Sequence, residues 1–170
     1  MSLKLKLASI LAGERSMQKE LETVDRLTTS ALRALLMEHA PEALKELAYR
    51  HYNYGSLEVG RREMAEAHNQ MIDLLIQAVG KEKAVKMGRR VMYEVGRSIG
   101  LDARRRFGVK DDLDDLEKAA KLLYRVLGID VRIEKGEDTV MIVDRCYLAE
   151  HYTPVSCLIM GAADEGMMTG

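Results

Sequence analysis

Apolar residues recur at three- and four-residue steps through the first two thirds of the chain, the spacing that lines one face of an α-helix. This pattern predicts long helices over about 16–39, 57–79, 81–107 and 113–127. Three consecutive hydroxyl residues at 28–30 are typical of a helix cap and suggest a restart within the first helix. Pro41 favours another short helix through about His51, because proline suits a first helical turn.

The hydrophobic period changes from 3.6 to 2 at position 129. Residues 129–134 alternate, 136–138 form a turn, and 139–143 are typical of a returning strand. Because the second strand is apolar after its first residue, we expect it inside a sheet. A lone hairpin is only marginally stable, so we expect further cover, with Leu3–Leu7 or a second chain as the extra strand. Helical spacing returns from Val155.

These elements predict an α+β fold, with a helical N-terminal two thirds packed on a small antiparallel sheet near the C-terminus. We divide the chain into a helical portion, 1–79, and an α+β portion, 80–170, within one compact domain. Gly96 and Gly100 share one face of their helix, so we expect another backbone to pack closely there.

Composition narrows the class of protein. The chain of 170 residues is 47% hydrophobic and 31% charged, as in an ordinary globular protein, and its net charge of -1 gives no reason to expect nucleic acid as a partner. The apolar N-terminal run contains Lys4 and Lys6 and is too short to span a bilayer, so we expect no membrane or targeting segment. Two cysteines make no disulfide framework, which favours the cytoplasm.

Candidate chemistry concentrates in the last quarter of the chain. Cys146 follows the second strand, Cys157 begins the next helix, and His151 lies between them. Thiolate, imidazole and carboxylate are zinc ligands, so these three residues are candidate metal ligands, with Glu150, Asp164 or a partner chain as the fourth. Two alternatives remain open at this point. The thiols are buried core residues, or Cys157 is a nucleophile with His151 as its base.

Tyrosines supply the candidate ligand-binding residues Tyr49, Tyr52 and Tyr147. Their rings suit a pocket for a flat ligand, although a half-packed helix end explains the cluster at 49–54 equally well. His68 lies on a predicted helix without a clear second ligand, which disfavours a metal role there.

Several segments of the C-terminal half resemble the vinyl-4-reductase domain family. They are Tyr93–Gly100, the acidic helix start at Asp111, the hairpin, Asp144–Cys146, and Pro154–Gly161 through Gly166. The resemblance implies an α+β small-molecule-binding domain with a pocket, frequent homodimers and a cysteine-based zinc site. Relatives usually continue with a further cysteine-containing strand, whereas the sequence given stops at Gly170, so only Cys146 and Cys157 can be matched to their cysteine site.

A second resemblance rests on Arg145-Cys146-x-x-Ala149-Glu150, then Cys157 and Asp164-Glu165. These residues are similar to the aminothiazoline-carboxylate hydrolase-like family, which implies a cysteine-dependent enzyme that opens a sulfur heterocycle, with Cys146, Cys157 and Asp164 in its active site. The segment between the cysteines is short for that family, so we rank it second. The sequence therefore favours a homodimeric protein that binds a small apolar or aromatic ligand, with a zinc site. A hydrolase and a structural dimerisation module are the alternatives.

Overall fold

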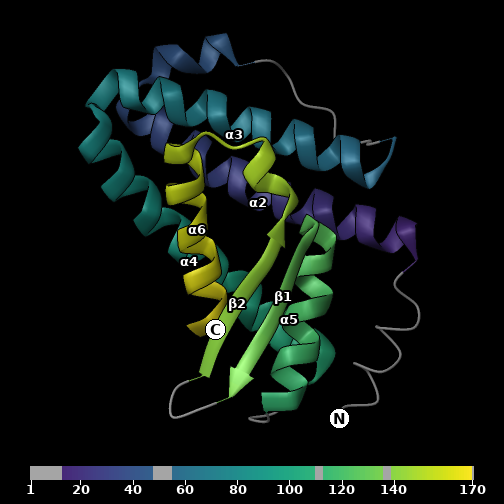
Figure 1. The fold of residues 1–170 in the computed structure, drawn as a ribbon. Helices are drawn as coiled ribbons and strands as arrows, with labels where there is room; N and C mark the ends of the chain where they lie inside the picture. The colour runs from purple at the N-terminus through teal and green to yellow at the C-terminus, as the bar shows by residue number, and fades with distance from the viewer. Residues whose placement is uncertain (1–12, 48–54, 110–112, 136–138, 170) are drawn as a thin grey trace.

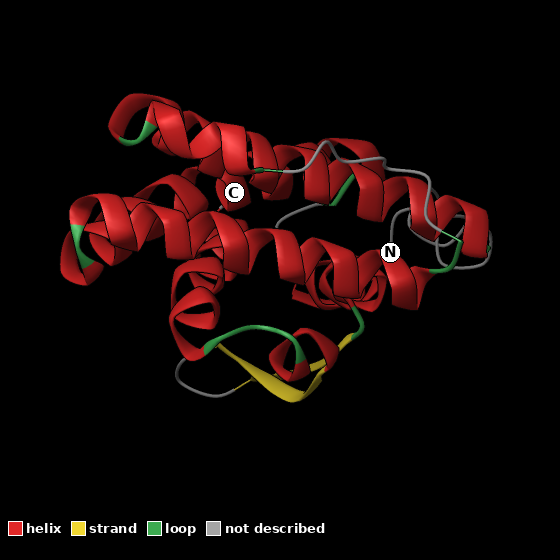
Figure 2. Cartoon of the chain, turned by 90° about the horizontal axis from the view of Figure 1, so that it is seen from above, coloured by secondary structure: helices red, strands yellow, loops and turns green. Residues whose placement is uncertain are grey.

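The computed structural model describes residues 13–47, 55–109, 113–135 and 139–169. In chain order the elements are α2 (Glu14–His39), the 3₁₀-helix η1 (Pro41–Glu46), α3 (Leu57–Val79), α4 (Lys81–Phe107), α5 (Leu113–Leu127), β1 (Ile129–Lys135), β2 (Thr139–Cys146), the 3₁₀-helix η2 (Tyr147–Glu150) and α6 (Pro154–Thr169). The helices form most of the molecule, and the strands lie at one edge of it (Figure 2). The predicted α+β class is confirmed.

The predicted long helices are confirmed, but the predicted restart inside α2 is wrong. Thr28 donates its hydroxyl hydrogen to the carbonyl of Val24, one turn earlier, at 2.9 Å. Thr29 donates to the carboxylate of Asp25 at 2.7 Å. A hydroxyl that bonds back into the preceding turn lets a helix continue, so these threonines do not cap a new one. Residues 48–51 of the predicted short helix lie outside the described residues.

The hairpin is antiparallel, with Val131 opposite Val143 and Ile133 opposite Met141. In the described part of the chain the sheet has only these two strands, so β2 has no second neighbour there and its predicted interior place stays a prediction. Val140 is 50% exposed and Val143 is 49% exposed. An unbroken apolar run does not by itself place a strand between two others. The expected cover comes from α5, which packs against β1 (Figure 1), whereas Leu3–Leu7 lies outside the described residues.

Helix α6 lies along α4, and glycines set how closely the two approach (Figure 1). A Cβ added to Gly96 would lie 1.9 Å from the carbonyl oxygen of Ala163, and one added to Gly166 would lie 2.0 Å from that of Tyr93. The prediction of close backbone packing at Gly96 and Gly100 is therefore confirmed, since Gly100 meets the carbonyl of Met167 in the same way. This contact fixes which face of α6 points into the molecule.

Two apolar clusters form the core. One joins α2, α3, α4 and α6 around residues such as Leu36, Ile72, Met92 and Ile159. The other joins α2, α3, α5, β1 and η2 around Leu21, Met64, Tyr124 and Val131. No helix in the described ranges carries an apolar stretch long enough to cross a membrane.

Candidate active site

The two cysteines line one cavity of about 100 Å³. Cys146 is the last residue of β2, and Cys157 lies in the first turn of α6, where its backbone N–H donates to the carbonyl of Thr153. Burial raises the pKa of the Cys146 thiol, and the neighbouring charges of Cys157 and Asp164 raise it further, against hydrogen bonds from the backbone at Ala149 and Leu148. Both cysteines named from the sequence thus line the same cavity, and Cys146 is a protonated thiol near neutral pH.

Asp164 lies seven residues after Cys157 on α6 and lines the same cavity. Burial raises the pKa of its carboxyl to about 6, although the Tyr124 hydroxyl, which donates to Oδ1 at 2.9 Å, opposes the shift. The second oxygen has no hydrogen-bond donor among the described residues. Asp164 is therefore a carboxylate that changes charge close to physiological pH and has one oxygen left for a ligand.

The rest of the cavity wall is mostly apolar, as is typical of a small-molecule site. Its other polar members are Glu20 and Thr28 from α2, His68 from α3, and Tyr152 from the loop before α6. Both oxygens of Glu20 accept hydrogen bonds from the Arg106 guanidinium, at 2.6 and 2.9 Å. Because Glu20 is already paired, Asp164 is the carboxylate that the described wall offers to a ligand.

The structure does not assemble the predicted zinc ligands. Neither His151 nor Tyr147 is part of the cavity wall. The His151 ring lies tilted against that of Tyr147, with centroids 4.8 Å apart, and its Nε2 is buried without a hydrogen-bond partner among the described residues. No group of three His, Cys, Asp or Glu side chains in the described ranges is arranged to hold a metal ion. His151 therefore does not line the cavity that the two cysteines share, and zinc binding stays a prediction.

Of the three predicted ligand-binding tyrosines, only Tyr147 lies among the described residues. Tyr49 and Tyr52 lie outside the described residues. Tyr147 packs beside the Arg61 guanidinium, 5.9 Å from its ring centroid, rather than against the cavity. The tyrosine that does line the cavity is Tyr152.

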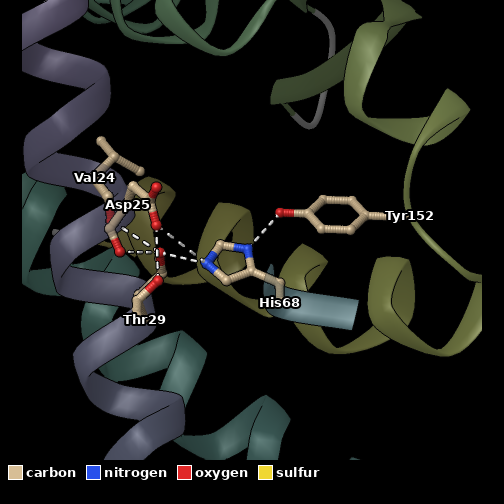
Figure 3. A network of polar contacts seen from close by, with 6 residues as sticks. Val24, Asp25, Thr29, His68 and Tyr152 are labelled. Atoms are coloured by element: carbon tan, nitrogen blue, oxygen red, sulfur yellow. Dashed lines mark hydrogen bonds and ion pairs between the residues drawn. The ribbon is translucent and has the colours of Figure 1, made fainter. Parts of the chain in front are cut away.

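A buried polar network joins this tyrosine to α2 and α3, and the sequence did not reveal it (Figure 3). The Tyr152 hydroxyl lies 2.8 Å from Nδ1 of His68, and Nε2 of His68 lies 3.0 Å from the Thr28 hydroxyl. A carboxylate oxygen of Asp25 lies 4.0 Å from the same Nε2. His68 and Asp25 are both fully buried. The available signal was that Asp25, Thr28 and His68 occupy core positions of otherwise apolar helix faces.

Comparison with known proteins identifies the family. A family model described as L-2-amino-thiazoline-4-carboxylic acid hydrolase matches residues 60–162, more than half of the 170-residue chain. The chain belongs to this family. No curated protein and no solved structure matches the chain significantly.

Membership of the aminothiazoline-carboxylate hydrolase family agrees with the second resemblance found in the sequence, and the vinyl-4-reductase resemblance gains no support. The matched segment runs from α3 into α6 and contains His68, Cys146, Tyr152 and Cys157. Asp164 follows it by two residues. The match therefore covers most of the elements that form the cavity wall.

Proposed function

We propose that the protein hydrolyses a small cyclic isothiourea of the 2-aminothiazoline class in this cavity. The observation that carries the proposal is that Cys146, Cys157 and Asp164 line a single, mostly apolar cavity. A cavity of about 100 Å³ with a mostly apolar wall limits the ligand to a small molecule. Family membership supports the same reaction class.

Asp164 suits the recognition of this ring. A 2-aminothiazoline carries its positive charge, when protonated, on an amidine-like group whose two nitrogens flank C2. A carboxylate accepts charge-assisted hydrogen bonds from such a group. The pKa of about 6 leaves Asp164 mostly ionised at neutral pH, so it holds the ring and increases the electrophilic character of C2.

Cys157 is the nucleophile in this proposal. It lies in the first turn of α6 and is exposed, whereas Cys146 is partly buried and its raised pKa keeps it protonated. The Cys157 sulfur bonds to C2, the bond from C2 to the ring sulfur breaks, and the ring sulfur leaves with a proton as a thiol. Water then attacks C2 and displaces Cys157. The ring and one water thereby become an open-chain carbamoyl thiol.

The test measures release of that thiol from 2-aminothiazoline-4-carboxylate and from the same ring without the carboxylate. We expect turnover of at least one ring by the unmodified protein. Cys157→Ser and Asp164→Asn each lower kcat/KM by roughly a hundredfold or more. Asp73→Asn, which changes an exposed carboxylate on α3, leaves it unchanged.

Two outcomes overturn the proposal. One is the lack of turnover of either ring by folded protein. The other is turnover that Cys157→Ser leaves intact. Saturable binding of a ring without its hydrolysis, followed by calorimetry, makes the cavity a small-molecule-binding site and also rejects the hydrolase.

A further inference from the structure

The network behind the cavity is unusual for a core position. His68, Asp25, Thr28 and Thr29 are all buried, in a region where apolar side chains would pack without a desolvation cost. Buried polar groups of this kind are stable only when each is hydrogen-bonded, and here they are bonded to one another. A connected set that extends from the interior to a cavity wall calls for a reason beyond packing.

The neighbours of His68 favour one arrangement of its two ring protons. The Thr28 hydroxyl has two backbone carbonyls within donating distance, those of Val24 at 2.9 Å and Asp25 at 3.1 Å, which favours an oxygen that accepts from Nε2–H of His68. The Asp25 carboxylate near Nε2 favours a proton there as well. Nδ1 is then unprotonated and accepts the hydroxyl hydrogen of Tyr152. Figure 3 shows this hydroxyl pointing at the imidazole.

Tyr152 also lines the cavity, together with Cys146, Cys157 and Asp164. Its proton is given to His68, so its remaining lone pair is available to accept a proton from the cavity.

We propose that Tyr152, His68 and Asp25 form a proton relay that serves this cavity. The chemical identity of the proton donor rests on the proposed function, whereas the arrangement of the relay does not. When Cys157 attacks, its thiol proton passes to the Tyr152 oxygen, and the Tyr152 proton passes to Nδ1 of His68. The resulting imidazolium keeps its bond to Thr28 and faces the Asp25 carboxylate. The reverse transfer delivers one proton to the departing ring sulfur, so no proton is gained or lost.

A purely structural role for the Tyr152 hydroxyl is less economical, because the loop before α6 is anchored independently. The Asn69 side chain donates to the carbonyl of His151 at 2.8 Å and accepts from the backbone N–H of Thr153 at 3.1 Å. These two bonds bracket Tyr152 on both sides. Removal of its hydroxyl should therefore leave the loop in place.

The kinetic test compares Tyr152→Phe and His68→Gln with the unmodified protein. Glutamine can hydrogen-bond but cannot hold the extra proton. We expect each variant to lower kcat by roughly 10²–10⁴-fold with KM changed less than about threefold, and the double variant to lose no more than either alone. The control is Tyr93→Phe, which removes a hydroxyl bonded to Thr169 away from the cavity and leaves kcat unchanged. Unchanged kcat in Tyr152→Phe, or additive losses in the double variant, overturns the relay.

A second measurement does not depend on turnover. Nitrogen-15 NMR of the unmodified protein reports the tautomer of His68 directly. We expect an unprotonated, hydrogen-bonded Nδ1 and a protonated Nε2, with the Nδ1 signal moving in Tyr152→Phe. A proton on Nδ1 in the resting protein overturns the relay. Lack of ring turnover with the expected tautomer instead rejects the proposed reaction and leaves the relay supported.

Discussion

Asp164 carries a stability cost that its position explains. Its pKa is raised from 3.8 to about 6, mainly by burial. For an acid whose pKa is higher in the folded state, the unfolded chain loses its proton first as pH rises. Folding is therefore disfavoured progressively between about pH 4 and pH 6, and the full cost persists above that range. At neutral pH the ionised Asp164 therefore lowers the stability of the fold, as is typical of buried functional groups.

Asp164→Asn should accordingly stabilise the protein at neutral pH. The amide oxygen still accepts from Tyr124, whereas the buried charge is gone. We expect the free energy of unfolding in urea to rise by roughly 1–2 kcal/mol at pH 7.5, with the gain fading at pH 4. Asp73→Asn, at an exposed position, should change it little at either pH. A gain that is the same at both pH values would show that the charge is not its cause.

At the scale of single residues, the sequence named the two cysteines and Asp164 as candidates but not the buried polar network around His68. Cys146 and Cys157 come from a strand end and a helix start that hydrophobic spacing located well. The partners of His68 lie 40 and 84 positions away, so no local pattern joins them. His151 misled us because it is near the cysteines in sequence, while its ring packs against Tyr147 instead.

At the scale of elements, the contact between α4 and α6 positions the site. Its glycines put the α6 backbone directly on α4, which aims Cys157 and Asp164 into the cavity. The spacing of Gly96 and Gly100 in the sequence predicted this close contact. The sequence did not predict that apolar side chains of β2 are exposed. Apolar residues in a strand do not reveal how many neighbouring strands it has.

Gly96→Ala should separate these helices. Its new methyl group would meet the Ala163 carbonyl at 1.9 Å, which neither backbone can accommodate without a shift. We expect a loss of about 3 kcal/mol in the free energy of unfolding, read from urea denaturation. Thiol release from the ring should fall with it, because α6 carries Cys157 and Asp164.

Gly161→Ala is the matched control for stability. This glycine is also in α6, but a Cβ there would have no atom within 4 Å. Because alanine is the better helix former, the change should stabilise the protein by up to about 1 kcal/mol. Equal destabilisation by both substitutions would mean that close packing is not what Gly96 provides.

At the scale of the whole molecule, one arginine links the helical N-terminal portion to the end of α5, just before the hairpin. Arg61 on α3 donates to the carbonyls of Val126 at 2.9 Å and Arg125 at 2.7 Å, which lie in the last turn of α5. Carbonyls at a helix end lack intrahelical partners, so these bonds satisfy two of them. The chain then turns into β1 at Gly128, whose φ of 72° is left-handed and favours glycine.

Arg61→Met should therefore lower the free energy of unfolding of the whole molecule, which still unfolds in a single transition. The change keeps much of the apolar stem but removes both donors to the α5 carbonyls, the one to Val126 in a partly buried place. We expect the free energy of unfolding to fall by about 2 kcal/mol, with far-ultraviolet circular dichroism and tyrosine fluorescence changing in a single transition.

Two further variants distinguish the loss of the Arg61 hydrogen bonds from the general effect of removing a positive charge. Arg61→Lys should recover only part of the loss, because an ammonium lacks the planar fork that reaches two carbonyls at once. Arg62→Met, at an exposed neighbour that faces Glu66 at 4.0 Å, should change stability by less than about 0.5 kcal/mol. If Arg61→Met instead produced two separate transitions, the helical portion and the hairpin would be independent folding units. The cavity between them would then depend on a contact other than this one.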